Sequence, residues 1–349
     1  MPPITTTAEG VSNLSEDKIL LAHGSGGKLS HELVKNVFLP VFDNPVLNQL
    51  DDRAEVQVGG VRLAFTTDSF VVNPIFFPGG DIGKLAVCGT VNDLAMGGAE
   101  PLYLSAGFII EEGFAVLSLR HIVASIKKTA DAAGVQIVCG DTKVVEKGSA
   151  DQIFINTSGI GLVPDGVNIS GASARPGDKV IINGFIGDHG MAVMAERHGL
   201  SFTKNIASDC APLNGLVKAM LRVSKDIHVL RDPTRGGVAT TLNEIAAQSK
   251  IGIILREKHI PVRDEVLAAC EILGFDPLYV ANEGKLLAIV PGELAASILA
   301  VMKKHPLGAD SAVIGEVVAD HPEKVVLSTG IGGRRIVDML VGEQLPRIC

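Results

Sequence analysis

The sequence predicts an α/β protein (of the α+β kind) with two domains and a C-terminal tail. At 349 residues the chain is longer than one ordinary hydrophobic core supports. Apolar runs typical of strands alternate with segments of helical periodicity along the chain. A Ser-Ala-Arg-Pro-Gly-Asp cluster at 173–178 interrupts this alternation near its middle, and such turn residues favour a domain boundary at 164–178.

In the first half, short apolar runs predict strands, and longer runs with apolar residues every three or four positions predict helices. The helix predicted at 115–133 ends before Gly134, because glycine commonly terminates helices. Strands are expected at 61–65, 135–139 and 153–163, and helices at 30–38, 82–96 and 115–133.

The second half repeats the mixed pattern. Strands are expected at 179–182, 251–256, 284–290, 313–318 and 324–328, and helices at 190–198, 213–224, 238–248, 263–273 and 295–304. Gly330, Gly332 and Gly333 open the last segment, and glycine-rich segments are flexible. We therefore expect a flexible leader at 1–18, an N-terminal domain at 19–165, a C-terminal domain at 166–328 and a mobile tail at 329–349.

Composition argues against several classes of partner. The net charge is -8 and no run of Lys or Arg occurs, so neither nucleic acid nor an anionic membrane is expected as the main partner. No stretch reaches the roughly 18 apolar residues of a membrane span, and the N-terminus lacks a signal-peptide pattern. The five cysteines are scattered, which indicates a reducing cytoplasm. Cys88, Cys139 and Cys270 are predicted to be core thiols.

Acidic residues recur in polar, glycine-containing contexts, at strand ends and near helix starts. A single carboxylate in such a place is often a helix cap or a turn-former. Several together favour a site for Mg²⁺, which binds a few carboxylates and then phosphate oxygens. The acidic residues that indicate a metal–nucleotide site are Asp51, Asp52, Asp68, Asp93, Asp141 and Asp232.

A glycine-rich loop, His23-Gly24-Ser25-Gly26-Gly27-Lys28, precedes the helix predicted at 30–38. Glycines allow backbone N–H groups to approach a phosphate closely, and Lys28 adds positive charge. The spacing is not that of a Walker A loop. A phosphate cover and a merely flexible loop remain open alternatives.

Asn282-Glu283-Gly284-Lys285 precedes the strand predicted to end at residue 290. A carboxylate beside a glycine can act as a general base for a group that swings into reach. A solvated turn is the alternative on this motif alone.

The chain ends in Pro346-Arg347-Ile348-Cys349. A terminal thiol on a short tail can be loaded with a group and swing into a site. Arg347 places a cation near this thiol, and a nearby cation favours the nucleophilic thiolate. Taken alone, the same residues also fit a frayed terminus that ends in cysteine.

Together, these motifs resemble the HypE family of hydrogenase-maturation proteins. That family belongs to the superfamily of aminoimidazole ribonucleotide synthetase, selenophosphate synthetase and thiamine-monophosphate kinase. The middle motifs mark the superfamily, whereas the terminal PRIC marks the HypE family. The matching runs span nearly the whole chain in family order: HGSGGK, the Asp51-Asp52 pair, TDS, NDLAMGGAEP, GDTKV, DPTRGG, NEGK and PRIC.

The resemblance implies a two-domain, aminoimidazole-ribonucleotide-synthetase-like fold with mixed sheets, a flexible C-terminal tail and a dimer formed through the N-terminal domains. It also implies an ATP-dependent carbamoyl dehydratase. A carbamoyl group on the thiol of Cys349 would be dehydrated from thiocarboxamide to thiocyanate, which supplies cyanide ligands for the iron of [NiFe]-hydrogenase. Glu283 would be the base, and Lys143 would orient the group or stabilise negative charge on its oxygen.

ATP and Mg²⁺ are the implied cofactors. Asp52, Asp68, Asp93 and Asp232 would hold Mg²⁺ and ATP. The other residues implied on the nucleotide are Asp51, Asp141, Thr142, Gly26, Gly27 and Lys28.

The resemblance further implies a carbamoyltransferase partner, HypF, and an iron scaffold, HypC–HypD, in the cytoplasm. Two other functions stay open on the sequence. A small-molecule kinase or ligase of the same superfamily would use the same carboxylates but would not need Cys349. A thiol-bearing scaffold that hands on a metal or ligand would not need the acidic residues.

Overall fold

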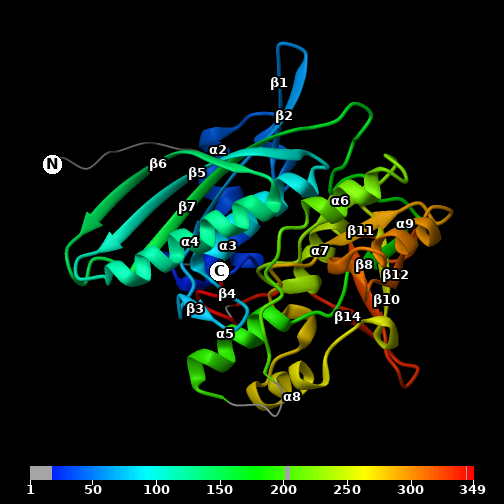
Figure 1. Cartoon of the computed structure of the whole chain (residues 1–349). Helices are drawn as coiled ribbons and strands as arrows, with labels where there is room; N and C mark the ends of the chain where they lie inside the picture. Colours follow the sequence, from blue (N-terminus) through cyan, green and yellow to red (C-terminus); the bar gives the residue numbers. More distant parts are fainter. Residues whose placement is uncertain (1–17, 201–204, 343) are drawn as a thin grey trace, which may run out of the picture.

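Two units, each built around a mixed β-sheet, share a hydrophobic core, and the second unit contains a further core of its own. The computed structural model describes residues 18–200, 205–342 and 344–349 (Figure 1). Val87 and Val91 of the first unit and Met191 and Leu216 of the second belong to the same cluster of buried side chains. The boundary between the units is therefore packed like a protein interior, which fixes the walls of any site built there.

The first unit contains a five-stranded sheet in the order β1-β2-β7-β5-β6. Strands β5 and β6 are parallel, and all other neighbours are antiparallel. The strands are β1 (Ala54–Val58), β2 (Val61–Phe70), β5 (Glu100–Glu111), β6 (Gln136–Val145) and β7 (Ile153–Leu162). Short helical segments precede them: a 3₁₀ turn (Leu21–Gly24), α1 (Lys28–Leu33), a π-helical turn (Val34–Phe38), α2 (Leu39–Phe42) and a second 3₁₀ turn (Leu47–Gln49).

Helices α3 (Ile82–Met96) and α4 (Val116–Ala133) cover one face of this sheet (Figure 1). A two-stranded hairpin, β3 (Phe76–Phe77) and β4 (Gly80–Asp81), leads into α3. The carboxylate of Asp81 caps α3 by accepting hydrogen bonds from the backbone N–H groups of Gly83 and Lys84. Almost every residue of α3 is buried, because the helix lies between the sheet and the second unit.

The second unit contains a seven-stranded sheet in the order β14-β13-β10-β12-β8-β11-β9, in which only β10 and β13 are parallel. Its strands are β8 (Lys179–Ile182), β9 (Val229–Arg231), β10 (Gly252–Arg256), β11 (Leu287–Val290), β12 (Ala312–Val318), β13 (Lys324–Ser328) and β14 (Arg334–Val337). Its helices are α5 (Asp188–His198), α6 (Asn214–Leu221), α7 (Gly237–Ser249), α8 (Asp264–Leu273) and α9 (Ala295–Met302), with 3₁₀ turns at Glu257–His259, Pro277–Tyr279 and Pro306–Gly308.

The mixed two-unit α/β fold predicted from the sequence is confirmed, as are most of its elements. The helix predicted at 82–96 and the strands at 179–182 and 324–328 coincide with α3, β8 and β13. The prediction of a strand that ends at residue 139 is wrong, because β6 continues to Val145 and carries Asp141 inside the strand. The strands that were not predicted are β1, β3, β4, β5, β9 and β14. Cys139 is exposed on the edge strand β6, whereas Cys88 and Cys270 are buried as expected.

The chain leaves the first sheet at Leu162 and enters the second at Lys179. The domain limits 19–165 and 166–328 stay predictions, and all but one residue of the predicted leader at 1–18 lies outside the described residues. The segment predicted as a mobile tail is docked in this structure: β14 pairs with β13, and Ile348 is 2% exposed. Its mobility stays a prediction.

Candidate active site

Four carboxylates from four elements meet at the boundary of the two units. Asp52 precedes β1, Asp68 lies on β2, Asp93 on α3, and Asp232 follows β9. Burial raises the pKa of Asp93 well above its ordinary range, and the charges of Asp68, Asp232 and Asp52 raise it further. Burial likewise raises the pKa of Asp52 and Asp68, and that of Asp232 to about 6. The structure therefore brings these predicted residues together, in a place where their negative charges are poorly compensated.

Arg231, at the end of β9, lies against this acidic cluster. Its Nε is 2.7 Å from Asp52 Oδ1, and its Nη2 is 2.8 Å from Glu244 Oε2. On the N-terminal side, the hydroxyl of Thr66 lies 2.8 Å from Asp93 Oδ2. These contacts orient Asp52 and Asp93 from both units.

The acidic cluster offers oxygen ligands of the kind that Mg²⁺ takes together with phosphate, and Mg²⁺ binding stays a prediction. Among the described residues no group of three or more His, Cys, Asp or Glu is arranged so that it could hold a metal ion by itself. Asp52 Oδ2 is nevertheless buried without a hydrogen-bond partner, so one oxygen ligand is left over. Mg²⁺ binds through one or two carboxylates, water and substrate phosphates, so an incomplete set of oxygen ligands suits it.

Asp51 has a different environment from Asp52. Its Oδ1 accepts a hydrogen bond from Gly171 N (2.9 Å), and its Oδ2 lies 3.3 Å from Arg53 Nη1. Asp51 thus joins the loop before β1 to the connection between the two units. Its predicted contact with the nucleotide stays a prediction.

The C-terminal tail reaches the same place. Its last residues run beside residues 71–73: Val71 N donates to Cys349 O (3.0 Å), and Asn73 N donates to Arg347 O (3.2 Å). His189 Nε2 lies 2.8 Å from Ile348 O, and Arg197 donates to Pro346 O (2.7 Å) and Arg347 O (2.9 Å). Two side chains of α5 therefore hold the tail by its carbonyl oxygens.

Cys349 is half-buried, and charged side chains surround its thiol. Burial raises its pKa to about 12, the cation of Arg235 opposes this shift, and the charge of Glu283 adds to it. The prediction that Arg347 supplies the cation near the thiol is wrong, because Arg347 is ion-paired with Asp151 and donates to Val71 O. Arg235 takes that place, and it also donates to Gly24 O (3.0 Å) in the glycine-rich loop.

Glu283 lies between the tail and the acidic cluster. It is 3% exposed, and its Oε1 is buried without a hydrogen-bond partner. Burial raises its pKa well above the usual range, and the neighbouring Cys210, Asp232, Asp209 and Asp68 raise it further. Because Glu283 is buried, the solvated-turn alternative does not hold, and its role as the base stays a prediction.

Asp141, Thr142 and Lys143 are not part of this constellation within one chain. Lys143 Nζ pairs with Asp141 Oδ2 (2.8 Å), and both side chains are 68% exposed on β6. In the strand register, Asp141 lies in one row with Gly107, Asn156 and Ser69. Asp68 precedes Ser69 and therefore lies in the neighbouring row. Because side chains alternate along strands, Asp141 and Lys143 lie on the sheet face opposite to Asp68 and α3.

The glycine-rich loop borders the site. Gly26 packs against Arg235, and Gly27 packs against Leu340 so closely that a Cβ atom would not fit. Lys28 is exposed, and its backbone N–H donates to Leu340 O (2.7 Å). The loop thus lies beside Arg235 and the approach to the tail, where its predicted role as a phosphate cover stays open.

Arg231, Arg235, His189 and Arg197 are site residues that the sequence reasoning missed. Arg235 lies inside the DPTRGG run, which was examined for its aspartate and its glycines. Arg235 could have been identified from the sequence, because it is a cation followed by two glycines at the start of a predicted helix. His189 and Arg197 stand in no recognised motif, and only the fold brings them to the tail.

The comparison with known proteins agrees with this geometry. Residues 50–163 match the family model of the AIR synthase related protein, N-terminal domain, and residues 175–328 match that of its C-terminal domain. No helix in the described ranges is long and apolar enough to span a bilayer.

A carbamoyl dehydratase HypE from Rhizobium leguminosarum bv. viciae is 54% identical over 338 residues, which covers 97% of each chain. A crystal structure of a HypE–HypF complex matches with a TM-score of 0.84 at 52% identity, over 88% of this chain and 99% of that chain. A structure of HypE in complex with ATP matches with a TM-score of 0.80 at 52% identity, over 95% and 100% of the two chains. The chain belongs to the HypE family of carbamoyl dehydratases.

Proposed function

We propose that this protein is an ATP-dependent carbamoyl dehydratase that acts in [NiFe]-hydrogenase maturation. Its substrate is a carbamoyl group carried on its own Cys349, and its product is the thiocyanate on the same sulfur, which supplies cyanide for the iron. The observation that carries the proposal is the half-buried Cys349 of the docked tail, whose thiol is affected by the charges of Arg235, Glu283 and the acidic cluster. Relatives named carbamoyl dehydratase HypE and the HypE structure with ATP support it.

The reaction removes water from an amide at the expense of ATP. The thiocarboxamide and ATP give the thiocyanate, ADP and inorganic phosphate. Attack of the amide oxygen on the γ-phosphorus turns this oxygen into a good leaving group, while Glu283 takes one N–H proton. The C–O bond then breaks, the second N–H proton is lost, and the C≡N bond forms. Arg235, beside the sulfur, offsets negative charge in this step.

Asp52, Asp68, Asp93 and Asp232 are the residues that would hold Mg²⁺, which supplies positive charge to the transferred phosphoryl group. Backbone N–H groups of Gly26 and Gly27, with Lys28, would cover the phosphates. Positive ligands also relieve the repulsion among the buried carboxylates.

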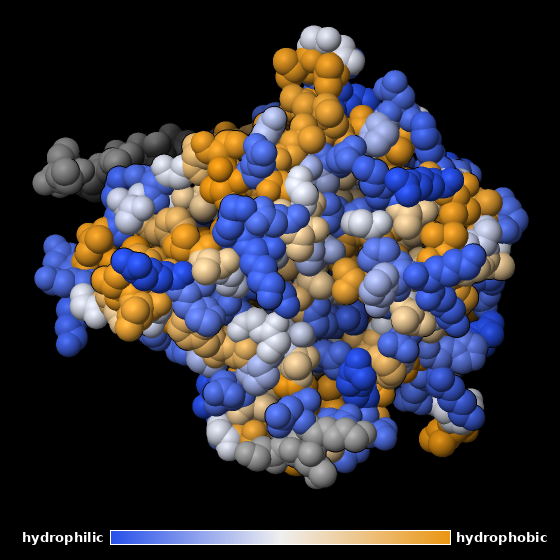
Figure 2. Space-filling view, viewed as in Figure 1, coloured by the Kyte–Doolittle hydropathy of each residue, from blue (hydrophilic) through white to orange (hydrophobic). Residues whose placement is uncertain are grey.

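We infer a homodimer through the uncovered face of the first sheet. Phe65, Tyr103, Ile109 and Ile160 are exposed on the face opposite to α3, although apolar side chains in such number seldom face water. Figure 2 shows apolar side chains gathered along the β1–β2 hairpin and around the end of the sheet near β6. A second copy on this face would cover them and would give Asp141 and Lys143 a neighbour whose site they could enter.

The partners follow from the chemistry of the tail. HypF, found in complex with the HypE relative, would load the carbamoyl group, and a HypC–HypD iron scaffold would accept the cyanide, both in the cytoplasm. Both transfers need the tail to leave the buried position seen here, so the tail would alternate between an exposed and a docked state.

Intact-mass spectrometry after incubation with ATP, Mg²⁺, carbamoyl phosphate and HypF tests the proposal. Wild type should gain the mass that corresponds to replacement of the thiol hydrogen by CN, and Cys349→Ala should gain none. Carbamoylation without dehydration would contradict the assigned catalytic roles. No modification at all, with transfer of phosphate from ATP to a small-molecule acceptor, would replace the proposal by the superfamily kinase.

A further inference from the structure

A buried carboxylate of the second unit holds the backbone of Glu283. Asp209 precedes α6, and its side chain is 3% exposed. Its Oδ1 accepts a hydrogen bond from Glu283 N at 3.1 Å, and its Oδ2 accepts one from Gly284 N at 3.2 Å. One carboxylate thus binds two successive backbone N–H groups, and hydrogen bonds to an ionised acceptor are stronger than those between neutral groups.

The backbone on the other side of Glu283 is fixed as well. Asn92, on α3 of the first unit, donates from Nδ2 to Glu283 O at 3.3 Å. Asn183 Nδ2 donates to Gly284 O at 3.1 Å. A Cβ atom at Gly284 would collide with the carbonyl oxygen of Asp209, so only glycine permits this close approach. The direction in which the Glu283 side chain leaves the backbone therefore depends on its contact with Asp209.

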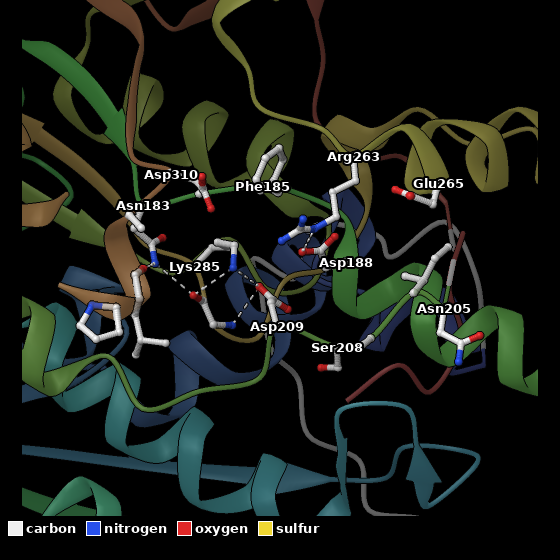
Figure 3. A pocket seen from close by; sticks show the side chains of 17 residues that line it. Asn183, Phe185, Asp188, Asn205, Ser208, Asp209, Arg263, Glu265, Lys285 and Asp310 are labelled. Carbon is white, nitrogen blue, oxygen red and sulfur yellow. Dashed lines mark hydrogen bonds and ion pairs between the residues drawn. The ribbon is translucent and has the colours of Figure 1, made fainter. Parts of the chain in front are cut away.

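Asp209 is held in its charged form. Lys285 Nζ lies 3.1 Å from Asp209 Oδ2 (Figure 3). Burial raises the pKa of Asp209, but the charge of Lys285 and the hydrogen bond from Glu283 N are among the effects that outweigh burial, so this pKa lies below its ordinary value. A negative charge is therefore present in hydrogen-bond contact with the backbone of the candidate base.

The ion pair of Asp209 and Lys285 faces a cavity of about 510 Å³ in the second unit (Figure 3). Glu283 does not line this cavity, and its Oε1 is buried without a hydrogen-bond partner. Water in the cavity can solvate the ammonium of Lys285 but does not reach Glu283 Oε1. The charge of Asp209 thus acts on Glu283 through a part of the protein that excludes water, where charges interact more strongly than in solvent.

Several groups from different elements act on the Glu283 carboxylate. Burial raises its pKa most, and neighbouring acidic groups raise it further, whereas Arg235 is the cation that faces it. Asp209 differs from a distant charge because it also holds the backbone of Glu283. The titratable and charged groups that face Glu283 are Cys210, Asp232, Asp209, Asp68, Arg235 and Cys349.

We propose that Asp209 is a positioning residue for the proposed reaction: it fixes the backbone of Glu283, and its negative charge, balanced by Lys285, makes Glu283 a stronger base. The inference rests on the proposed function, because it requires Glu283 to accept the N–H proton. Asp209 acts through Glu283 and not on the carbamoyl group. A role limited to stability would reduce the amount of folded protein without moving the pH dependence of the reaction.

The pH dependence of dehydration, measured in single turnovers of the carbamoylated full chain, tests the inference. In Asp209→Asn the amide oxygen still accepts one backbone N–H, but the negative charge is lost, so Glu283 gives up its proton more readily. We expect the acidic limb of the rate profile to move lower by about one pH unit, together with a lower plateau rate. Asp310→Asn, at an exposed carboxylate that lines the same cavity, should keep the wild-type profile.

Lys285→Gln provides a second test that leaves Asp209 intact. Without this cation the charge of Asp209 is less balanced, so the acidic limb should move to higher pH, opposite to the shift in Asp209→Asn. An unchanged limb in both variants, or a shift of both in the same direction, would overturn the inference. If Asp209→Asn does not fold, Lys285→Gln alone decides. Wild type that accepts the carbamoyl group but does not dehydrate it would contradict the proposed function itself, which distinguishes the two failures.

Discussion

At the scale of single residues, the site depends on carboxylates kept out of water without a full set of partners. Glu283 is the clearest case, because its Oε1 has no partner and its neighbours Asp209 and Asp232 are negative. Burial and these negative charges raise the pKa of Glu283, so it keeps its proton at a pH where an ordinary carboxylate is ionised. The same features that make Glu283 costly for stability make it a stronger base than an ordinary carboxylate.

Glu283→Gln should therefore accept the carbamoyl group on Cys349 but lose dehydration by a factor of about 10² or more. In wild type, the rate of dehydration should fall as the pH drops through the raised pKa of Glu283, well above the ordinary carboxylate range. Single-turnover mass spectrometry of carbamoylated protein from about pH 5 to pH 9 measures both effects. Dehydration by the glutamine variant at the wild-type rate would remove Glu283 from the mechanism.

Asp93→Asn should stabilise the protein in the absence of nucleotide. The pKa of Asp93 is raised in the folded state, so its contribution to stability is present at low pH and is lost as the pH rises through that pKa. The variant should melt about 2–4 °C above wild type near pH 8, and the difference should vanish at low pH. Asp165→Asn, which alters an exposed carboxylate, serves as the control. A lower melting temperature for Asp93→Asn near pH 8 would contradict the assigned charge repulsion.

At the scale of elements, helix α5 holds the tail in its docked position through hydrogen bonds. Arg197 donates to Asn73 O, Pro346 O and Arg347 O, and so links the docked tail to residues that follow β2. Hydrogen bonds from a charged group contribute about 1.5–3 kcal/mol each, so their loss should shift the tail toward the exposed state.

Arg197→Gln should therefore expose Cys349. We expect alkylation of Cys349 by iodoacetamide, located by peptide mass, to accelerate about tenfold or more, while dehydration slows. Arg222→Gln, at an exposed arginine that does not contact the tail, should alkylate as wild type does. Equal alkylation rates in all three proteins would mean that Arg197 does not hold the tail.

The elements that the sequence predicted well are those whose own periodicity decides their structure, such as α3. Strand β5 was missed because Pro101 and Gly107 interrupt it, and its stability comes from pairing with β6 and β7. Likewise, Gly140 and Asp141 have the composition of a turn but lie within β6. The docking of the last residues could not be predicted, since the hydrogen bonds that hold Pro346, Arg347, Ile348 and Cys349 reach residues at least 149 positions earlier in the chain. Motifs did select Asp52, Asp68, Asp93 and Asp232, which the fold brings together.

At the scale of the whole molecule, one chain does not complete the predicted constellation. Lys143 lies on β6, and β6, β5, β7 and β2 are successive neighbours, so three strand spacings of about 4.8 Å separate it from Asp68 on the opposite face. In the homodimer proposed above, a second copy would cover the exposed apolar side chains on the face of the sheet that carries Lys143. If Lys143 takes part in the reaction, it acts on the site of its partner.

Mixing two inactive variants tests this arrangement. One variant carries Lys143→Ala and keeps Cys349, and the other carries Cys349→Ala and keeps Lys143. If Lys143 acts across the dimer, the mixed dimer joins an intact Lys143 of one chain to an intact Cys349 of the other. Dehydration should then reappear on the Lys143→Ala chain after subunit exchange, and intact mass distinguishes the two chains. If Lys143 acts within its own chain, no exchange can restore activity, because the chain that retains Cys349 lacks the lysine. An Ile109→Asp variant, with a charge placed beside Lys143 on the uncovered face of the sheet, should abolish the recovery by preventing association, whereas Ile331→Asp, at the exposed turn before β14, should not.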